Sequence, residues 1–123
     1  MRLLIDTHIL IWFAAGSDRL PVAMRDAMID EGSVLHVSAV TVWEISIKRA
    51  LGKLDVPASL VVRARDFGFL PLPVTWAHAE EAGSLPVHHS DPFDRMLIAQ
   101  ARLEDLVVMT LDRQFRHYDL ALF

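Results

Sequence analysis

Short apolar runs alternate along the chain with longer amphipathic segments, and this alternation predicts the secondary structure. Strands are expected at 2–6, 34–38, 69–74 and 106–110, with a last one at 120–123. Helices are expected at 7–14, 21–30, 41–51, 57–67, 75–82 and 91–105, and 112–117 is predicted to be a polar turn or a short helix. Because the strands alternate with helices and are mostly apolar throughout, we predict an α/β fold whose central, mainly parallel sheet is covered on both faces.

Glycine and proline residues mark several of these boundaries. Gly16, Gly52 and Gly68 follow helical segments, at the position where glycine commonly ends a helix. Pro71 and Pro73 each remove a backbone N–H from the segment 69–74. This segment is therefore predicted to be an edge strand and not a central one.

Four acidic residues lie within or beside the apolar segments. Asp6 and Asp112 follow strands, Asp94 stands early in the helix 91–105, and Glu44 falls on the expected buried stripe of the helix 41–51. That stripe follows helical spacing through Val40, Trp43, Ile47 and Leu51. A carboxylate against apolar surface is unfavourable unless it is paired or binds a metal. Because ligands of parallel sheets bind beyond the carboxyl ends of the strands, the four acids can converge there on a hard divalent cation.

Each acid also has a purely structural explanation. Asp6 could cap the helix that follows it, and Glu44 could pair with the lysine four residues later. Asp94 has capping-box spacing after Asp91 and suits the dipole of the helix, whereas Asp91 is best explained as the cap itself. Asp112 could form a turn. These alternatives stay open for each acid alone, but all of them would have to hold together.

Composition limits the class of protein. A chain of 123 residues fits one domain, and 53% hydrophobic residues suggest apolar surface that is buried in a partner or a second copy. The net charge of −4 says little about nucleic acid, because bound metal would offset the four acids. Cysteine is absent, no signal peptide is apparent, and charge-free stretches such as 32–43 are too short to span a membrane. We expect a cytoplasmic protein without a membrane partner.

Four segments together resemble PIN domains, and more narrowly the VapC-type toxins of bacterial toxin–antitoxin pairs. They are Leu3–His8, Ser38–Ile45, Asp91–Ala101 and Thr110–Phe115, and they follow one another in the order of the family's motifs. The resemblance covers nearly the whole chain. It implies a single PIN-like domain over 1–123, a three-layer α/β/α sandwich, and a Mg²⁺- or Mn²⁺-dependent endoribonuclease.

The resemblance also implies roles for individual residues. It implies that Asp6, Glu44, Asp94 and Asp112 form the acidic quartet that is catalytic and holds the metal. It further implies that hydroxyl groups support this quartet, and the candidates are Thr7, Ser38 and Thr110. Family members usually form homodimers and are inhibited by an antitoxin whose tail enters the acidic groove. The expected partners are therefore an RNA substrate, a cognate antitoxin and a second copy of the chain, or a larger complex with the antitoxin.

Basic residues near these motifs are candidates for contacts with RNA phosphates. They are Lys48, Arg95 and Arg113, although such residues often only line solvated helix faces. The histidines, among them the pair His88 and His89, lack the spacing of a zinc site and are interpreted as ordinary structural or polar residues.

Metal-assisted hydrolysis of RNA should leave a 5′-phosphate and a 3′-hydroxyl. A metal-free ribonuclease based on histidine would leave a cyclic phosphate instead. A metal-dependent phosphatase often shows Asp-x-Asp after its first strand, where this chain has His8. A receiver-like signalling module would need a late lysine, and none follows Lys53. A dinucleotide-binding fold is disfavoured because the chain has no Gly-x-Gly-x-x-Gly.

Overall fold

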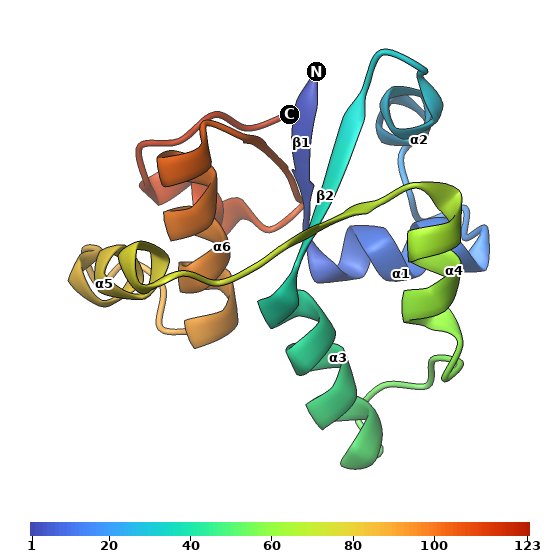
Figure 1. Ribbon diagram of the computed structural model, residues 1–123, viewed down its shortest axis with the longest axis horizontal. Coiled ribbons are helices and arrows are strands. Elements are labelled where there is room, and N and C mark those ends of the chain that lie inside the picture. Colours follow the sequence, from blue (N-terminus) through green and yellow to red (C-terminus); the bar gives the residue numbers. More distant parts are fainter.

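The computed structural model (Figure 1) describes residues 1–123. It contains one sheet of four parallel strands. The strands are β1 (Arg2–Ile5), β2 (Val34–Ser38), β3 (Leu70–Leu72) and β4 (Val107–Met109), in the spatial order β3-β2-β1-β4. Parallel neighbours require the chain to cross back between strands, and the crossovers here are helical. Because all four strands run the same way, their carboxyl ends meet at one edge of the sheet.

Six α-helices and one short 3₁₀ helix surround this sheet. They are α1 (Thr7–Ala15), α2 (Val22–Ile29), α3 (Ala39–Ala50), α4 (Leu60–Phe67), α5 (Trp76–Ser84), α6 (Pro92–Glu104) and η1 (Arg113–His117). The predicted alternation of strands and helices is confirmed. No helix reaches the length and apolarity that a membrane crossing requires.

Strand β1 is buried on both faces, which makes the molecule a three-layer sandwich. Leu3 and Ile5 belong to one apolar core, together with residues of α1, α2 and α4. Leu4, on the opposite face, belongs to a second core with residues of α6 and the C-terminal segment. Figure 1 shows α1, α2 and α4 on one side of the strands and α5 and α6 on the other. This confirms the predicted α/β class and its layering.

The last predicted strand is wrong. Residues 120–123 do not form a strand, and Leu122 makes only an isolated parallel bridge to Val108. The edge position predicted for 69–74 is correct, since β3 pairs with β2 alone and Pro71 lies within it.

The buried face of α3 also differs from the prediction. Trp43 and Leu51 were expected in the core but are 61% and 63% exposed. The buried residues of this helix are instead Val40, Thr41, Glu44 and Ile45. Trp43 lies edge-on against Phe93 of α6, with ring centroids 5.4 Å apart, so it contacts a neighbouring helix and not the sheet. Glu44 is buried as expected, but on a differently oriented stripe.

Candidate metal-binding acidic site

The four acids of the predicted quartet line one cavity of about 320 Å³. Asp6 follows β1, Glu44 lies on α3, Asp94 lies in the first turn of α6, and Asp112 precedes η1. Asp91, the cap of α6, lines the same cavity. The parallel sheet brings these groups together, because β1 and β4 both end at this edge and α3 begins at the end of β2.

Asp6 is almost fully buried, with 6% exposure, and accepts two short hydrogen bonds. Its Oδ1 accepts from the Thr7 N–H at 2.7 Å, and its Oδ2 accepts from the Thr110 hydroxyl at 2.7 Å. Burial raises the pKa of this carboxyl, and the two hydrogen bonds offset the rise only in part. Asp6 therefore both caps α1 and presents a poorly solvated carboxylate to the cavity.

Glu44 is buried at 4% exposure, and each of its carboxylate oxygens has a protein partner. Oε1 accepts from the Thr7 hydroxyl at 2.7 Å, and Oε2 pairs with the Lys48 ammonium at 2.6 Å. The hydrogen bond to Glu44 raises the pKa of Lys48. The pairing with Lys48 that the sequence allowed is thus present, and it leaves Glu44 better compensated than the other acids.

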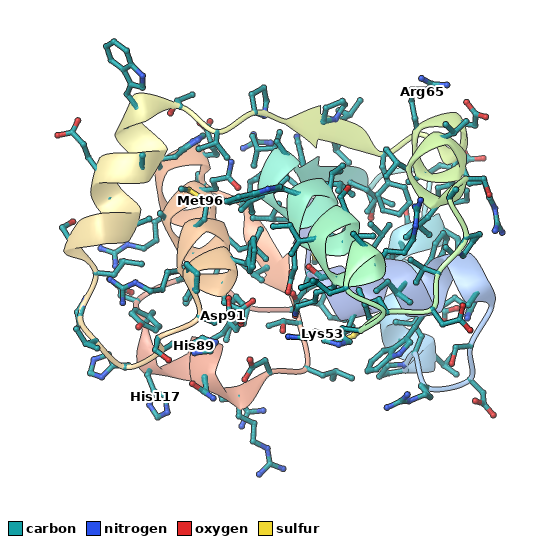
Figure 2. The ribbon with its side chains drawn as sticks, turned by 90° about the horizontal axis from the view of Figure 1, so that it is seen from below. Lys53, Arg65, His89, Asp91, Met96 and His117 are labelled. Atoms are coloured by element: carbon teal, nitrogen blue, oxygen red, sulfur yellow. The ribbon has the colours of Figure 1, made fainter.

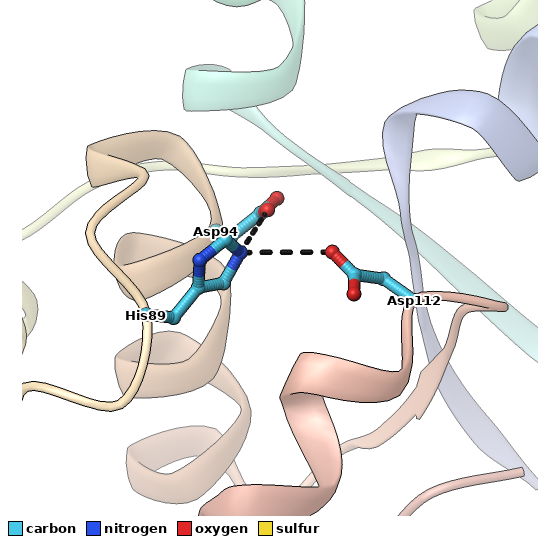
Figure 3. Close-up of side chains that lie close together, drawn as sticks. All are labelled: His89, Asp94 and Asp112. Carbon is cyan, nitrogen blue, oxygen red and sulfur yellow. Dashed lines mark hydrogen bonds and ion pairs between the residues drawn. The ribbon is translucent and has the colours of Figure 1, made fainter.

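Asp94 carries the least compensated charge of the group. Its Oδ2 lies 2.7 Å from Nε2 of His89, while its Oδ1 has no hydrogen bond to the protein (Figure 3). The pKa of Asp94 is raised from its ordinary value of 3.8 to about 7. Burial contributes most to this rise, the negative charges of Asp6 and Asp91 add to it, and His89 partly offsets it. A carboxylate in this environment favours a cation.

Asp112 is the most open of the four, with 35% of its side chain exposed. Its Oδ1 accepts from the Gln114 N–H at 2.9 Å, and its Oδ2 lies 3.6 Å from Nε2 of His89. The Thr110 hydroxyl accepts from the Asp112 N–H at 3.0 Å while it donates to Asp6. Thr110 thereby links two acids that stand far apart in the sequence.

The predicted hydroxyl supports separate into two kinds. Thr7 and Thr110 contact the acids directly. Ser38, which is fully buried, does not contact them, and its hydroxyl accepts from the Val40 N–H at 3.0 Å as the cap of α3. Its effect on the site is indirect, through the start of the helix that carries Glu44.

The three basic candidates differ in what they contact. Lys48 pairs with Glu44, and Arg113 is exposed without an ion pair or hydrogen bond to the protein. The prediction that Arg95 contacts phosphate does not fit the structure, because its guanidinium donates to four backbone carbonyls at 2.9–3.2 Å, those of Ala82, Leu85, Pro86 and His89. Arg95 fixes a loop and has little capacity left for RNA.

Two residues of the site, Arg19 and His89, were not predicted from the sequence. Arg19 lines the cavity, and its guanidinium lies 4.9 Å from the ring centre of Trp12. His89 forms a cluster with Asp94 and Asp112 in which one ligand atom of each lies within 4.8 Å of the others. Figure 2 shows His89 and Asp91 at the start of α6, on the side where η1 carries His117. No sequence spacing distinguishes the buried His89 from the exposed His88.

The fold, together with the acids at the carboxyl edge of the sheet, indicates a protein family. Residues 3–120 match the model of the PIN domain family, so the chain belongs to this family. The predicted resemblance to VapC-type proteins is also confirmed. Ribonuclease VapC22 of Mycobacterium tuberculosis is 28% identical, over 94% of this chain and 90% of that protein.

Solved structures agree with this assignment at the level of the fold. VapBC2 from Rickettsia felis, bound to a DNA fragment from its promoter, gives a TM-score of 0.73 at 13% identity and covers 100% of this chain and 98% of that one. VapC20 from Mycobacterium tuberculosis, a toxin that cleaves the sarcin–ricin loop, gives a TM-score of 0.67 at 18% identity, over 97% of this chain and 96% of that one.

Proposed function

We propose that this protein is a metal-dependent endoribonuclease and the toxin of a toxin–antitoxin pair. The observation that carries the proposal is the gathering of Asp6, Glu44, Asp94 and Asp112 from four separate segments of the chain around one cavity. The names of two relatives support it, since VapC22 is called a ribonuclease and VapC20 a toxin that cleaves the sarcin–ricin loop. The same names favour RNA hydrolysis over a phosphatase or a receiver-like module.

The donor set fits a hard divalent cation such as Mg²⁺ or Mn²⁺, because every quartet member offers carboxylate oxygen. Asp6 and Asp94 would be the primary ligands: both are largely buried, and the pKa of each is raised by burial. Glu44 and Asp112 would assist directly or through water. When bound, the ion would lower the pKa of an attacking water and stabilise the charge that develops on the scissile phosphate.

The protein's own residues would position the acids and the substrate. Thr110 holds one oxygen of Asp6, and Thr7 holds one oxygen of Glu44, so neither carboxylate turns freely. Arg19 at the wall of the cavity and the exposed Arg113 beside Asp112 would contact RNA phosphates. Arg19 lies over the Trp12 ring, which fixes its direction.

We further propose that the chain acts in the cytoplasm, as a homodimer that a cognate antitoxin inhibits, alone or within a larger complex. Several structural neighbours carry VapBC names, and one of them was solved on promoter DNA. Exposed aromatic side chains also favour a protein partner. Trp76 is 91% exposed and Trp43 is 61% exposed. Large apolar side chains that stay open to solvent often mark a surface that binds another protein.

Cleavage of transfer, ribosomal and messenger RNA in Mg²⁺ or Mn²⁺ tests the proposal. We expect cleavage with 5′-phosphate and 3′-hydroxyl ends, stopped by EDTA and reduced at least about 100-fold by Asp6→Asn or Asp94→Asn. Asp66→Asn is the matched control, since Asp66 is an exposed acid on α4 that does not line the cavity. Activity that survives EDTA, or products with cyclic phosphate ends, would contradict the metal-dependent proposal.

A further inference from the structure

His89 lies between two acids that come from different parts of the fold. Its Nε2 is 2.7 Å from Oδ2 of Asp94 on α6 and 3.6 Å from Oδ2 of Asp112 before η1 (Figure 3). It is the one side chain that is hydrogen-bonded or ion-paired to both acids. Only 9% of the His89 side chain is exposed, so the imidazole belongs to the wall of the site and not to the solvated surface.

The loop that carries His89 is held in place by two side chains outside the cavity. The Tyr118 hydroxyl accepts from the backbone N–H groups of His89 at 2.9 Å and His88 at 3.2 Å, and it donates to the Pro86 carbonyl at 2.8 Å. Arg95 donates to the carbonyls of Pro86 and His89 in the same loop. The His89 ring also lies edge-on to buried Phe115, with centroids 6.3 Å apart. These contacts leave the imidazole little freedom to turn away.

We propose that His89 is a positioning residue for the acidic site, an inference that rests on the proposed function. Its imidazole N–H holds one oxygen of Asp94 and draws Asp112 toward it, which offsets the repulsion between the two carboxylates. The other oxygen of Asp94 then remains free for the cation, because no protein group donates to it. Arg95 and Tyr118 act one step further out, since they fix the loop that presents His89.

Binding of Mn²⁺ measured by calorimetry, together with RNA cleavage, tests this role. Loss of a group that orients metal ligands typically costs 10–100-fold in affinity, and we expect a loss of about that size for His89→Ala. His89→Gln should retain most of the affinity, because its amide N–H can reach the same carboxylates. The matched control is His88→Ala, which removes the exposed neighbouring histidine and should leave Mn²⁺ binding unchanged.

Each result decides the inference. Wild-type Mn²⁺ affinity in His89→Ala would overturn the inference. Equal losses of Mn²⁺ affinity in His89→Ala and His89→Gln would also overturn it, because they would indicate that the ring nitrogen itself is a metal ligand. Thermal melting checks that the variants fold. If His89→Ala does not fold, Tyr118→Phe takes its place. We then expect weaker Mn²⁺ binding, and unchanged Mn²⁺ binding would contradict the inference. A wild-type protein that neither binds Mn²⁺ nor cleaves RNA would refute the proposed function. If the wild type and the His89 variants all bind Mn²⁺ and cleave RNA equally well, only the role of His89 is refuted.

Discussion

Among single residues, Asp94 couples the candidate site most directly to pH. Its pKa of about 7 in the folded protein lies above the ordinary value of 3.8. The native state therefore binds more protons than the unfolded state between these two values, and its stability falls as the pH rises from about 4 to about 7. Above that range the destabilisation persists, because the buried carboxylate stays charged.

Replacing Asp94 by Asn should therefore stabilise the metal-free protein at pH 8, since the amide keeps the shape of the side chain without its charge. We expect the melting temperature in EDTA to rise by a few degrees, as about 1 kcal/mol corresponds to roughly 3–6 °C for a chain of this size. At pH 4 the variant and the wild type should melt almost together. A lower melting temperature for Asp94→Asn at pH 8 would show that the carboxylate stabilises the fold instead.

The residues of the site were predictable from sequence to different degrees. Asp6 and Asp112 stand directly beside apolar runs, so their approach to the sheet edge could be inferred from strand direction. His89 could not, because its role depends on a loop conformation that Tyr118 imposes from 29 positions away. The phosphate contact predicted for Arg95 was not supported for the same reason. Its partners are backbone carbonyls, and the sequence pattern of side chains does not show where these carbonyls point.

Between elements, Thr110 connects the end of β4 to the end of β1, and its hydroxyl is satisfied on both sides. Replacing Thr110 by Val should reduce the free energy of unfolding by about 1–2 kcal/mol, because it leaves Oδ2 of the buried Asp6 without a hydrogen bond. Urea denaturation measures this change. Under the proposed function, metal-dependent cleavage should fall as well, since only one oxygen of Asp6 would still be held, by the Thr7 N–H.

Thr41 on α3 offers a matched control for Thr110→Val, because the same substitution there removes a hydroxyl that makes no hydrogen bond. Its hydroxyl is buried without a hydrogen-bond partner in the protein, so Thr41→Val should cost nothing or slightly raise the free energy of unfolding. A loss in Thr41→Val as large as that in Thr110→Val would mean that the hydrogen bonds of Thr110 are not the cause of its effect.

The elements themselves were largely predictable where local signals decide them. Gly16 and Gly68 adopt left-handed backbone conformations at the ends of α1 and α4, and Asp91 with Pro92 begins α6 as expected. The face of α3 was not predictable, because Trp43 contacts Phe93 of another helix, and hydrophobicity alone cannot distinguish that contact from burial in the core. Residues 120–123 do not form a strand because only Leu122 forms a bridge, to Val108 of β4.

For the whole molecule, the proposed function would make folding and cation binding depend on each other through the cavity acids. Mn²⁺ should raise the melting temperature of the wild type at pH 8, because a ligand that binds only the native state stabilises it. The rise should be smaller at pH 5, where Asp94 is largely protonated and protons compete with the ion. Differential scanning calorimetry with and without EDTA measures it. An equal rise in Asp94→Asn would place the bound ion elsewhere.

The pairing of β1 with β4 joins Leu3 to Val107 and brings the first and last acids of the site, Asp6 and Asp112, to the same cavity. A nascent polypeptide that ends before β4 lacks Thr110 and Asp112 and leaves Asp6 without its hydroxyl partner. Under the proposed function, such an unfinished chain has no complete nuclease centre. Under the same function, early termination on this message would release a fragment without the complete site, and the chain could cleave RNA only after β4 and Asp112 had been synthesised.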